Sequence, residues 1–343
     1  MEKFKQELIT EVSIKINNSN DCLMNLSDVN EFISRIDISK DQIIRVFSWM
    51  IHFGIIEFNG TTFGEQIIDL HHRYIDLVNE RIGGFDINPL DFVPSESQTI
   101  QADVKRSHFL FEKTCENIGI EMVFQENVLE IAYRVLCMLS LCVESLVYTQ
   151  GFDRFMLHTY ALGLLFIKRI GLPIELAESI SYYLTREFLL YADISSSLMD
   201  PSESEAMFLQ LDSMIQVHSP TIYESLTSSN LSSFHFALRW KLLFFADEYE
   251  SPALYLIWDQ LLMNSHRFMD YFFALSLAHV FQIPYEDGPT FVEKAQKHKD
   301  WDIDLVFNQT ESILSSKTTK PSYGKLLILG GIAASAIAYY YLK

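Results

Sequence analysis

The chain has 343 residues but only four cysteines, and no two of them are spaced as a CxxC pair. So few cysteines exclude a disulfide-rich scaffold and are typical of a protein in a reducing compartment. Because Cys137 and Cys142 are five residues apart, they would lie on different faces of a helix. We therefore expect the thiols to act as small core residues.

Basic residues are scarce, with 26 Lys and Arg against 45 Asp and Glu, and the formal net charge is −19. A surface this acidic repels phosphate backbones, so no nucleic acid is expected as a partner. The sequence contains neither a GxxxxGK[ST] phosphate loop nor a GxSxG nucleophile elbow. The chain is therefore not expected to bind nucleotide itself as a P-loop protein. No metal site is expected either, because adjacent His71 and His72 cannot share one metal on one helix face.

No segment alternates apolar and polar residues with the period of two that a half-buried strand requires. Apolar residues recur instead at helical spacing, as in the runs Ile43, Val46, Phe47, Met50 and Leu129, Ala132, Tyr133, Leu136. The nine prolines fall between such runs or in their first turn. At Ser251-Pro252, for example, serine is expected to cap a helix and proline to occupy its first position. The pattern predicts an all-α fold with a dozen or more short helices.

The two ends of the chain differ in character. The N-terminal segment MEKFKQELITEVSIKI has no apolar core of a signal peptide. Residues 326–342, in contrast, are 17 residues without a charge between Lys325 and Lys343. A helix of that length spans roughly 25 Å, which is closest to the thin bilayer of the endoplasmic reticulum. This run predicts a single-pass transmembrane tail anchor, with a buried C-terminal helix as the alternative.

Lysines and breaker residues set the expected topology. Three lysines precede the apolar run and one follows it, so the positive-inside rule places residues 1–325 in the cytosol. Stretches rich in Pro, Ser, Thr and Asp at 85–97 and 310–325 suggest boundaries. We predict a helical N-terminal part at 1–84, a core at 85–309, a linker at 310–325 and the membrane span at 326–342.

Two polar stretches could carry chemistry: IQADVKRS at residues 100–107 and VYTQGFD at 147–153. On a helix, Asp103 would lie beside Arg106 and could orient its guanidinium. Gln150 follows an apolar run and precedes Gly151, which allows a turn or a close approach. Taken alone, the first pattern favours a surface ion pair, and the second favours a helix C-cap carrying a solvated glutamine. Neither Arg nor Gln is a nucleophile or strong base, so they suit charge neutralisation and the holding of a water molecule.

Together, the two stretches resemble the signature of the TBC domain, the family of Rab GTPase-activating proteins. The patterns are IxxDxxR at 100–106 and YxQG at 148–151. Four further blocks occur in the family's order: DQIIRVFSWMIHFG (41–54), SPTIYESL (219–226), FALRWKLLFFADE (236–248) and LYLIWDQLL (254–262). The resemblance covers roughly residues 40–285 and implies a multi-helical TBC-like domain.

The resemblance also implies a mechanism. Arg106 is the arginine finger, which stabilises charge on the phosphoryl oxygens of a partner's GTP, and Gln150 is the glutamine finger, which orients the attacking water. Asp103 would orient Arg106, while Tyr148 and Gly151 would shape the loop that carries Gln150. Arg239, Trp240, Trp258 and Asp259 are assigned to the scaffold and to finger support. The chain needs no cofactor of its own, because Mg²⁺ and GTP belong to the GTPase.

The expected partners are a GTP-loaded Rab and, through the C-terminal helix, a lipid bilayer. The segment Asp103-Val104-Lys105-Arg106-Ser107 also resembles the membrane-anchored branch of the family, which implies a Rab of the endoplasmic reticulum to Golgi class and a place on that or another internal membrane. The family usually shows Met-Asn after the glycine, whereas Phe152-Asp153 stand here. The alternative is therefore a catalytically inactive TBC-like module that binds Rabs or tethers membranes.

Overall fold

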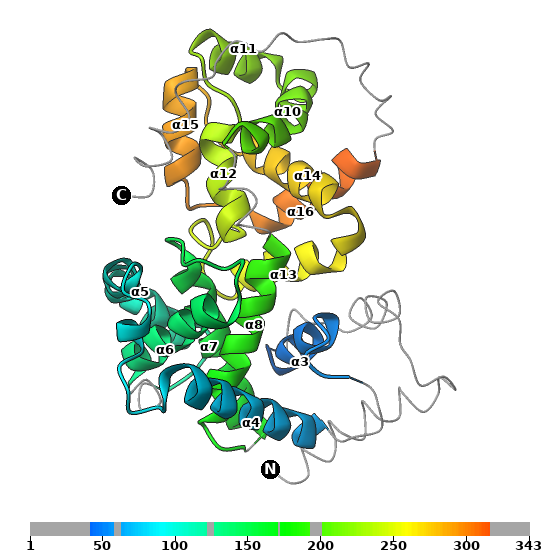
Figure 1. The fold of residues 1–343 in the computed structure, drawn as a ribbon. Coiled ribbons are helices and arrows are strands. Elements are labelled where there is room, and N and C mark those ends of the chain that lie inside the picture. Colours follow the sequence, from blue (N-terminus) through cyan, green and yellow to red (C-terminus); the bar gives the residue numbers. More distant parts are fainter. Residues whose placement is uncertain (1–41, 58–62, 122–126, 171, 193–200, 316–343) are drawn as a thin grey trace, which may run out of the picture. The chain divides into compact units, whose positions relative to one another are not determined.

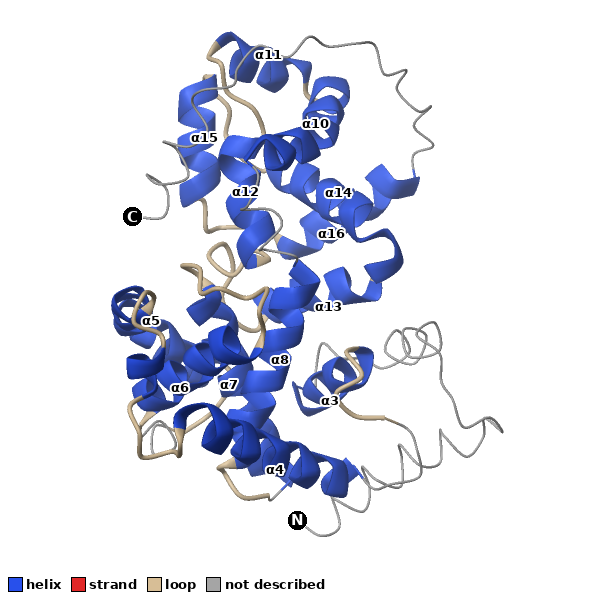
Figure 2. Ribbon diagram, in the orientation of Figure 1, coloured by secondary structure: helices blue, strands red, loops and turns tan. Residues whose placement is uncertain are grey.

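The structure, a computed structural model, describes residues 42–57, 63–121, 127–170, 172–192 and 201–315 (Figure 1). Every regular element in these ranges is a helix (Figure 2), which confirms the predicted all-α class. Within the same ranges, no helix is both long enough and apolar enough to traverse a bilayer. The span predicted at 326–342 lies outside the described residues, as does Cys22.

The chain divides into two compact units, Met1–Tyr191 and Ala192–Lys343. In the first unit the elements are α3 (Gln42–His52), α4 (Phe63–Ile82), η1 (Pro89–Phe92), α5 (Ser97–Asn117), α6 (Val128–Cys142), α7 (Phe152–Ile170) and α8 (Leu176–Ala192), of which α8 ends at the boundary. Helix α5 packs against α6 and α7, and α3 packs against α7. The site discussed below lies entirely in this unit.

The helices of the first unit follow the predicted apolar stripes. Val46, Phe47 and Met50 are buried on α3, and α6 is buried along most of its length. Cys115 and Cys137 are also buried, and burial raises the pKa of each thiol to about 12. Both thiols therefore stay protonated and pack as core residues, as expected.

A buried ion pair connects three helices of the first unit. Arg134 on α6 makes two contacts to the carboxylate of Glu178 on α8, with N–O distances of 2.6 and 2.8 Å. Tyr74 on α4 donates its hydroxyl to the same carboxylate at 2.8 Å. Because a buried carboxylate needs several donors to offset its lost hydration, this cluster fixes α4, α6 and α8 relative to one another.

The second unit contains α10 (Pro201–His218), α11 (Pro220–Ser228), α12 (Phe234–Leu243), α13 (Ala253–Met263), η3 (Ser265–Arg267), α14 (Phe268–Val280), α15 (Gly288–Lys297) and α16 (Ile303–Ser315). Helix α14 is buried on nearly every side and packs against α10, α12, α13 and α16. Trp240 and Trp258 are fully buried here, and the Trp258 indole donates to the Phe244 carbonyl at 2.9 Å.

Two local predictions are wrong. Helix α16 includes residues 310–315, where the sequence predicts the start of a linker, and Thr310 is buried with its hydroxyl donating to the Val306 carbonyl at 2.8 Å. That bond lets a polar residue continue the helix. Helix α13 begins at Ala253, so Pro252 rather than Ser251 takes the capping position, and the Ser251-Pro252 peptide is cis. The remaining domain boundaries stay predictions.

Candidate functional site

Arg106 projects from a helix whose opposite face is buried. On α5 the buried positions include Ile100, Asp103, Val104 and Ser107, at the spacing of one helical face. Arg106 lies beside this face with a side chain that is 55% exposed, while its ion-pair partner Asp103 is only 2% exposed. The guanidinium is therefore presented to solvent by a carboxylate fixed in the core, as the spacing of the two residues predicts.

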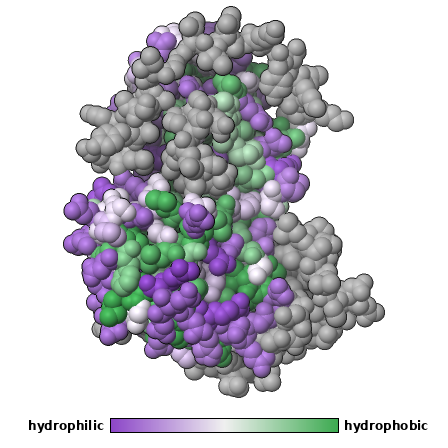
Figure 3. Space-filling model, viewed as in Figure 1, coloured by the Kyte–Doolittle hydropathy of each residue, from purple (hydrophilic) through white to green (hydrophobic). Residues whose placement is uncertain are grey.

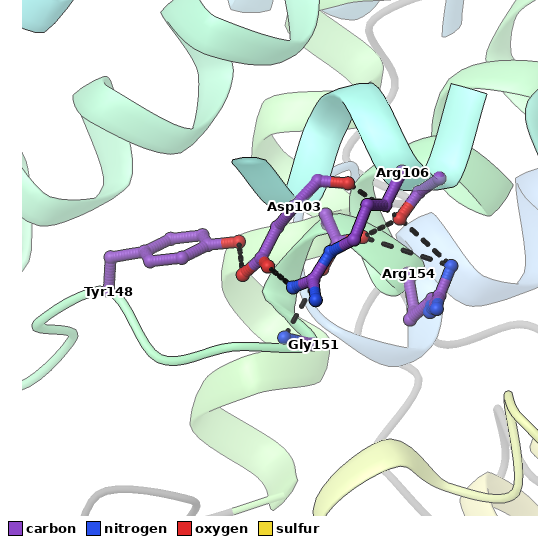
Figure 4. A network of polar contacts seen from close by, with 7 residues as sticks. Asp103, Arg106, Tyr148, Gly151 and Arg154 are labelled. Atoms are coloured by element: carbon purple, nitrogen blue, oxygen red, sulfur yellow. Dashed lines mark hydrogen bonds and ion pairs between the residues drawn. The ribbon is translucent and has the colours of Figure 1, made fainter. Parts of the chain in front are cut away.

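The second oxygen of Asp103 contacts the other motif. The Tyr148 hydroxyl donates to Asp103 Oδ2 at 2.9 Å, while Asp103 Oδ1 accepts from Arg106 (Figure 4). Burial raises the pKa of Tyr148 well above its ordinary value, and the carboxylates of Asp153 and Asp103 raise it further. Tyr148 therefore remains a hydrogen-bond donor at any physiological pH and connects the loop to the arginine-bearing helix.

Glu96, just before α5, holds the same loop from the other side. Its Oε2 accepts from the backbone N–H of Tyr148 at 3.1 Å and from the Ser140 hydroxyl at 2.6 Å. Tyr148 is thus fixed at both its backbone and its side chain. Glu96 is not among the residues predicted for the site, because no local pattern relates it to Tyr148, which lies 52 residues further along the chain.

Gln150 lies in the loop at 143–151, between α6 and α7. Helix α6 ends at Cys142 and α7 begins at Phe152, so Gly151 precedes a helix. The alternative of a helix C-cap at Gln150 is therefore wrong. Gly151 has φ +106°, a conformation that side-chain-bearing residues rarely adopt, and Gln150 is partly exposed. A glycine is required at this point for the chain to turn from the loop into α7.

Phe152 and Asp153, which depart from the family pattern, are both buried and both make specific contacts. The Phe152 ring meets that of Tyr148 edge to face, with centroids 5.6 Å apart. Asp153 accepts from the Gly151 N–H at 3.2 Å and from the Ser107 hydroxyl. Arg154 adds a hydrogen bond to the Ser107 oxygen at 2.9 Å (Figure 4). The departure therefore leaves the loop well packed.

The five residues predicted for the site come together in this way. Asp103, Arg106, Tyr148 and Gly151 belong to one polar network, and Gln150 is joined to it through its neighbour Gly151. The network combines α5, the loop at 143–151 and the first turn of α7. What the arrangement offers chemically is an exposed cation on α5 and a partly exposed carboxamide in the loop that contacts this helix.

The exposed residues of α5 and of the loop at 143–151 are mixed in character. Lys105 and Phe109 on α5 are exposed, and Val147 in the loop is exposed as well. Figure 3 shows apolar residues among polar ones on the viewed face. Such a mixture of exposed apolar and cationic side chains suits a protein partner, because both kinds of group can contribute to binding.

Two other expectations from the sequence concern metal ligands and scaffold residues. Among the residues that the structure describes, no group of three His, Cys, Asp or Glu could hold a metal ion. Arg239, Trp240, Trp258 and Asp259 lie in the second unit, where Arg239 pairs with the buried Glu248 and donates to the Gln296 carbonyl at 2.7 Å. These contacts agree with a scaffold role, whereas support of the fingers stays a prediction.

Comparisons with known proteins give the same family as the motifs. The model of the Rab-GTPase-TBC domain matches residues 86–284, which is more than half of the chain. No curated protein matches the sequence. Among solved structures, the chain is similar to the Ypt/Rab-GAP domain of Gyp1p, with a TM-score of 0.64 at 15% identity, over 89% of this chain and 97% of that one. That likeness concerns the fold, and the family match carries the assignment: the chain belongs to the Rab-GTPase-TBC domain family.

Proposed function

We propose that this protein is a GTPase-activating protein for a Rab-family GTPase, with Arg106 as the arginine finger and Gln150 as the glutamine finger. The observation that carries the proposal is the network in which one buried carboxylate, Asp103, binds both exposed Arg106 and Tyr148 of the glutamine loop. Such an arrangement holds the arginine helix and the glutamine loop together before any partner arrives, and catalysis by positioning requires that preorganisation.

Each residue then has one task. Negative charge builds up on the γ-phosphoryl oxygens during hydrolysis, and the Arg106 guanidinium stabilises it by donating hydrogen bonds. The Gln150 carboxamide orients the attacking water, while Mg²⁺ and the nucleotide stay with the GTPase. Asp103 and Tyr148 keep the two elements in place without touching the substrate. The protein therefore supplies side chains in trans and does not hydrolyse nucleotide alone.

The proposal extends to the membrane. Residues 326–342 contain no charge and are flanked by lysines, which supports a tail anchor that leaves the domain facing the cytosol. The short span favours the endoplasmic reticulum or another thin internal membrane, and a Rab of the endoplasmic reticulum to Golgi class as substrate. Deleting residues 326–343 is expected to move the protein from the membrane to the soluble fraction in cell fractionation, and unchanged retention would refute the anchor.

The test of the activity is phosphate release from a panel of GTP-loaded Rabs, each mixed with the full-length chain or with the Arg106→Ala/Gln150→Ala double variant. At least one Rab is expected to hydrolyse GTP faster with the wild-type chain, and the double variant is expected to remove the effect. Binding to a GTP-loaded Rab without acceleration would instead support the inactive Rab-binding module.

A further inference from the structure

Helix α5 and the segment that carries Gln150 are connected by two buried carboxylates, one from each side. Helix α5 contributes Asp103, which accepts from Tyr148 of the loop. The first turn of α7 contributes Asp153, which accepts from Ser107 of α5. Asp153 is 2% exposed, and its other oxygen accepts from the Gly151 N–H at 3.2 Å. Ser107 directly follows the arginine finger in sequence, and Gly151 directly follows the glutamine finger.

The hydrogen atoms in the second contact can be assigned from the donors present. Arg154 can only donate, so its Nη1 gives a hydrogen to the Ser107 oxygen at 2.9 Å. The Ser107 hydroxyl has a single hydrogen and two acceptors in reach, the Asp153 carboxylate and the Asp103 carbonyl at 2.9 Å. The charged carboxylate is the stronger acceptor. The chain of donors therefore runs from Arg154 through Ser107 to Asp153.

We infer that Asp153 and Ser107 are positioning residues that hold the glutamine loop in register with the arginine helix. This inference rests on the proposed function, since register matters only where both fingers act on one phosphate. Tyr148 anchors the loop on one side of Gln150 through its bond to Asp103, and the far end of the loop, at Gly151, lies on the other side. Asp153 binds that end through the Gly151 N–H and connects it to the residue after Arg106.

The contact geometry makes Asn the conservative replacement at position 153. The oxygen of an asparagine amide could still accept from the Gly151 N–H, and its NH₂ group could donate to the Ser107 oxygen. Ser107 would then turn its own hydrogen to the Asp103 carbonyl, which already lies at 2.9 Å. Asp153→Asn thus keeps the connection, whereas Asp153→Ala removes both contacts. Both variants remove the negative charge, so a difference between them reports the hydrogen bonds and the shape of the side chain rather than its charge.

The experiment compares full-length wild type, Asp153→Ala, Asp153→Asn and Ser107→Ala on the Rab that the wild type activates best. Asp153→Ala is expected to lower kcat by about ten-fold to a hundred-fold, the effect of misplacing a reacting group by about 1 Å, with KM changed less than about two-fold. Ser107→Ala should lower kcat in the same direction, and Asp153→Asn should restore most of the rate. Asp69→Ala is the matched control, because Asp69 is a 65% exposed carboxylate on α4, and its loss changes the net charge equally.

A second measurement needs no GTPase. Amide hydrogen exchange of residues 148–152 in the free chain should become faster in Asp153→Ala, because the Gly151 N–H loses its acceptor, and should stay near the wild-type rate in Asp153→Asn. An unchanged kcat or an unchanged exchange rate in Asp153→Ala would overturn the inference and leave the proposed function intact. A wild-type chain that activates no Rab would overturn both.

Discussion

Replacing Arg106 with alanine separates a catalytic role from a structural one, because the two roles predict very different magnitudes. The side chain is 55% exposed and pairs with Asp103, so the stability that it contributes is that of a partly solvated ion pair, about 0–1 kcal/mol. Because the Arg106 side chain is largely exposed, water can replace it at Asp103 Oδ1, and the substitution leaves the bond from the Tyr148 hydroxyl to Oδ2 untouched. The free energy of unfolding is therefore expected to fall by no more than about 1 kcal/mol.

The expected catalytic loss is several times larger. An arginine supplied in trans accelerates GTP hydrolysis by roughly 10³–10⁵-fold, which corresponds to about 4–7 kcal/mol of activation free energy. Single-turnover phosphate release from a GTP-loaded Rab measures the rate, and urea denaturation of the free chain measures the stability. If Arg106 is catalytic, the increase in the activation free energy of GTP hydrolysis should exceed the decrease in the free energy of unfolding by at least about 3 kcal/mol.

Two further variants make the comparison sharper. Lys113→Ala removes the same charge from another exposed position on α5, about two turns further along the helix, so its rate should stay within about three-fold of wild type. Arg106→Lys keeps the charge but loses the planar fork, and it should recover no more than about ten-fold over alanine. Two results would refute the reasoning: an Arg106→Ala chain as active as wild type, or Lys113→Ala and Arg106→Ala losing equal activity.

Three other outcomes follow from the same contacts. Tyr148→Phe leaves the buried Asp103 without one donor, so thermal or urea denaturation should show a loss of about 1–3 kcal/mol, with slower phosphate release; an unchanged stability would contradict the assigned bond. Gln150→Ala should lower phosphate release by about a hundred-fold while unfolding stays within about 0.5 kcal/mol, because the side chain is partly exposed; equal activity would exclude a glutamine finger. Lowering the pH from 7 to 5 should reduce stability by on the order of 1 kcal/mol per buried histidine for each unit below 6.5. Burial lowers the pKa of these histidines from 6.5, to about 4 or about 3 (His52, His158, His279). Below pH 6.5 the histidines bind protons in the unfolded chain but stay neutral in the folded chain until about pH 4–3. Their contribution to stability is therefore complete above pH 6.5 and is lost as the pH falls. A free energy of unfolding that does not change with pH in urea denaturation would contradict this.

Features that depend on local spacing could be predicted from the sequence. The apolar stripe on α3 needs only the helical period, and its residues are buried as expected. The contact between Asp103 and Arg106 is also local, since residues three apart are neighbours on a helix. The thiols of Cys115 and Cys137 lie in the core for the same reason, because they belong to helices with apolar faces. In each case, one short segment contained the required information.

Features that depend on tertiary contacts could not be predicted in this way. The Tyr148 hydroxyl meets Asp103 across 45 residues of chain, and Ser107 meets Asp153 across 46. No periodicity in one segment specifies such a pairing, which arises only when α5 packs against α7. From the sequence alone, Glu96 and Asp153 would be expected to be solvated surface residues, because a carboxylate is seldom buried unless it has partners. The family resemblance implied supporting roles for Asp103, Tyr148 and Gly151, but it did not indicate the contacts that Glu96, Ser107 and Asp153 make to the same elements.

The distribution of charge explains how so acidic a chain can approach a phosphate. The net charge of −19 belongs to the whole sequence, and exposed charges farther away than a Debye length of about 10 Å are largely screened. At the site, the two carboxylates Asp103 and Asp153 are buried and accept hydrogen bonds from Arg106, Tyr148, Ser107 and Gly151. The exposed groups on this stretch of α5 include the cations Lys105 and Arg106. Under the proposed function, a phosphate would therefore meet the exposed guanidinium of Arg106, while the buried carboxylate of Asp103 beneath it orients that guanidinium.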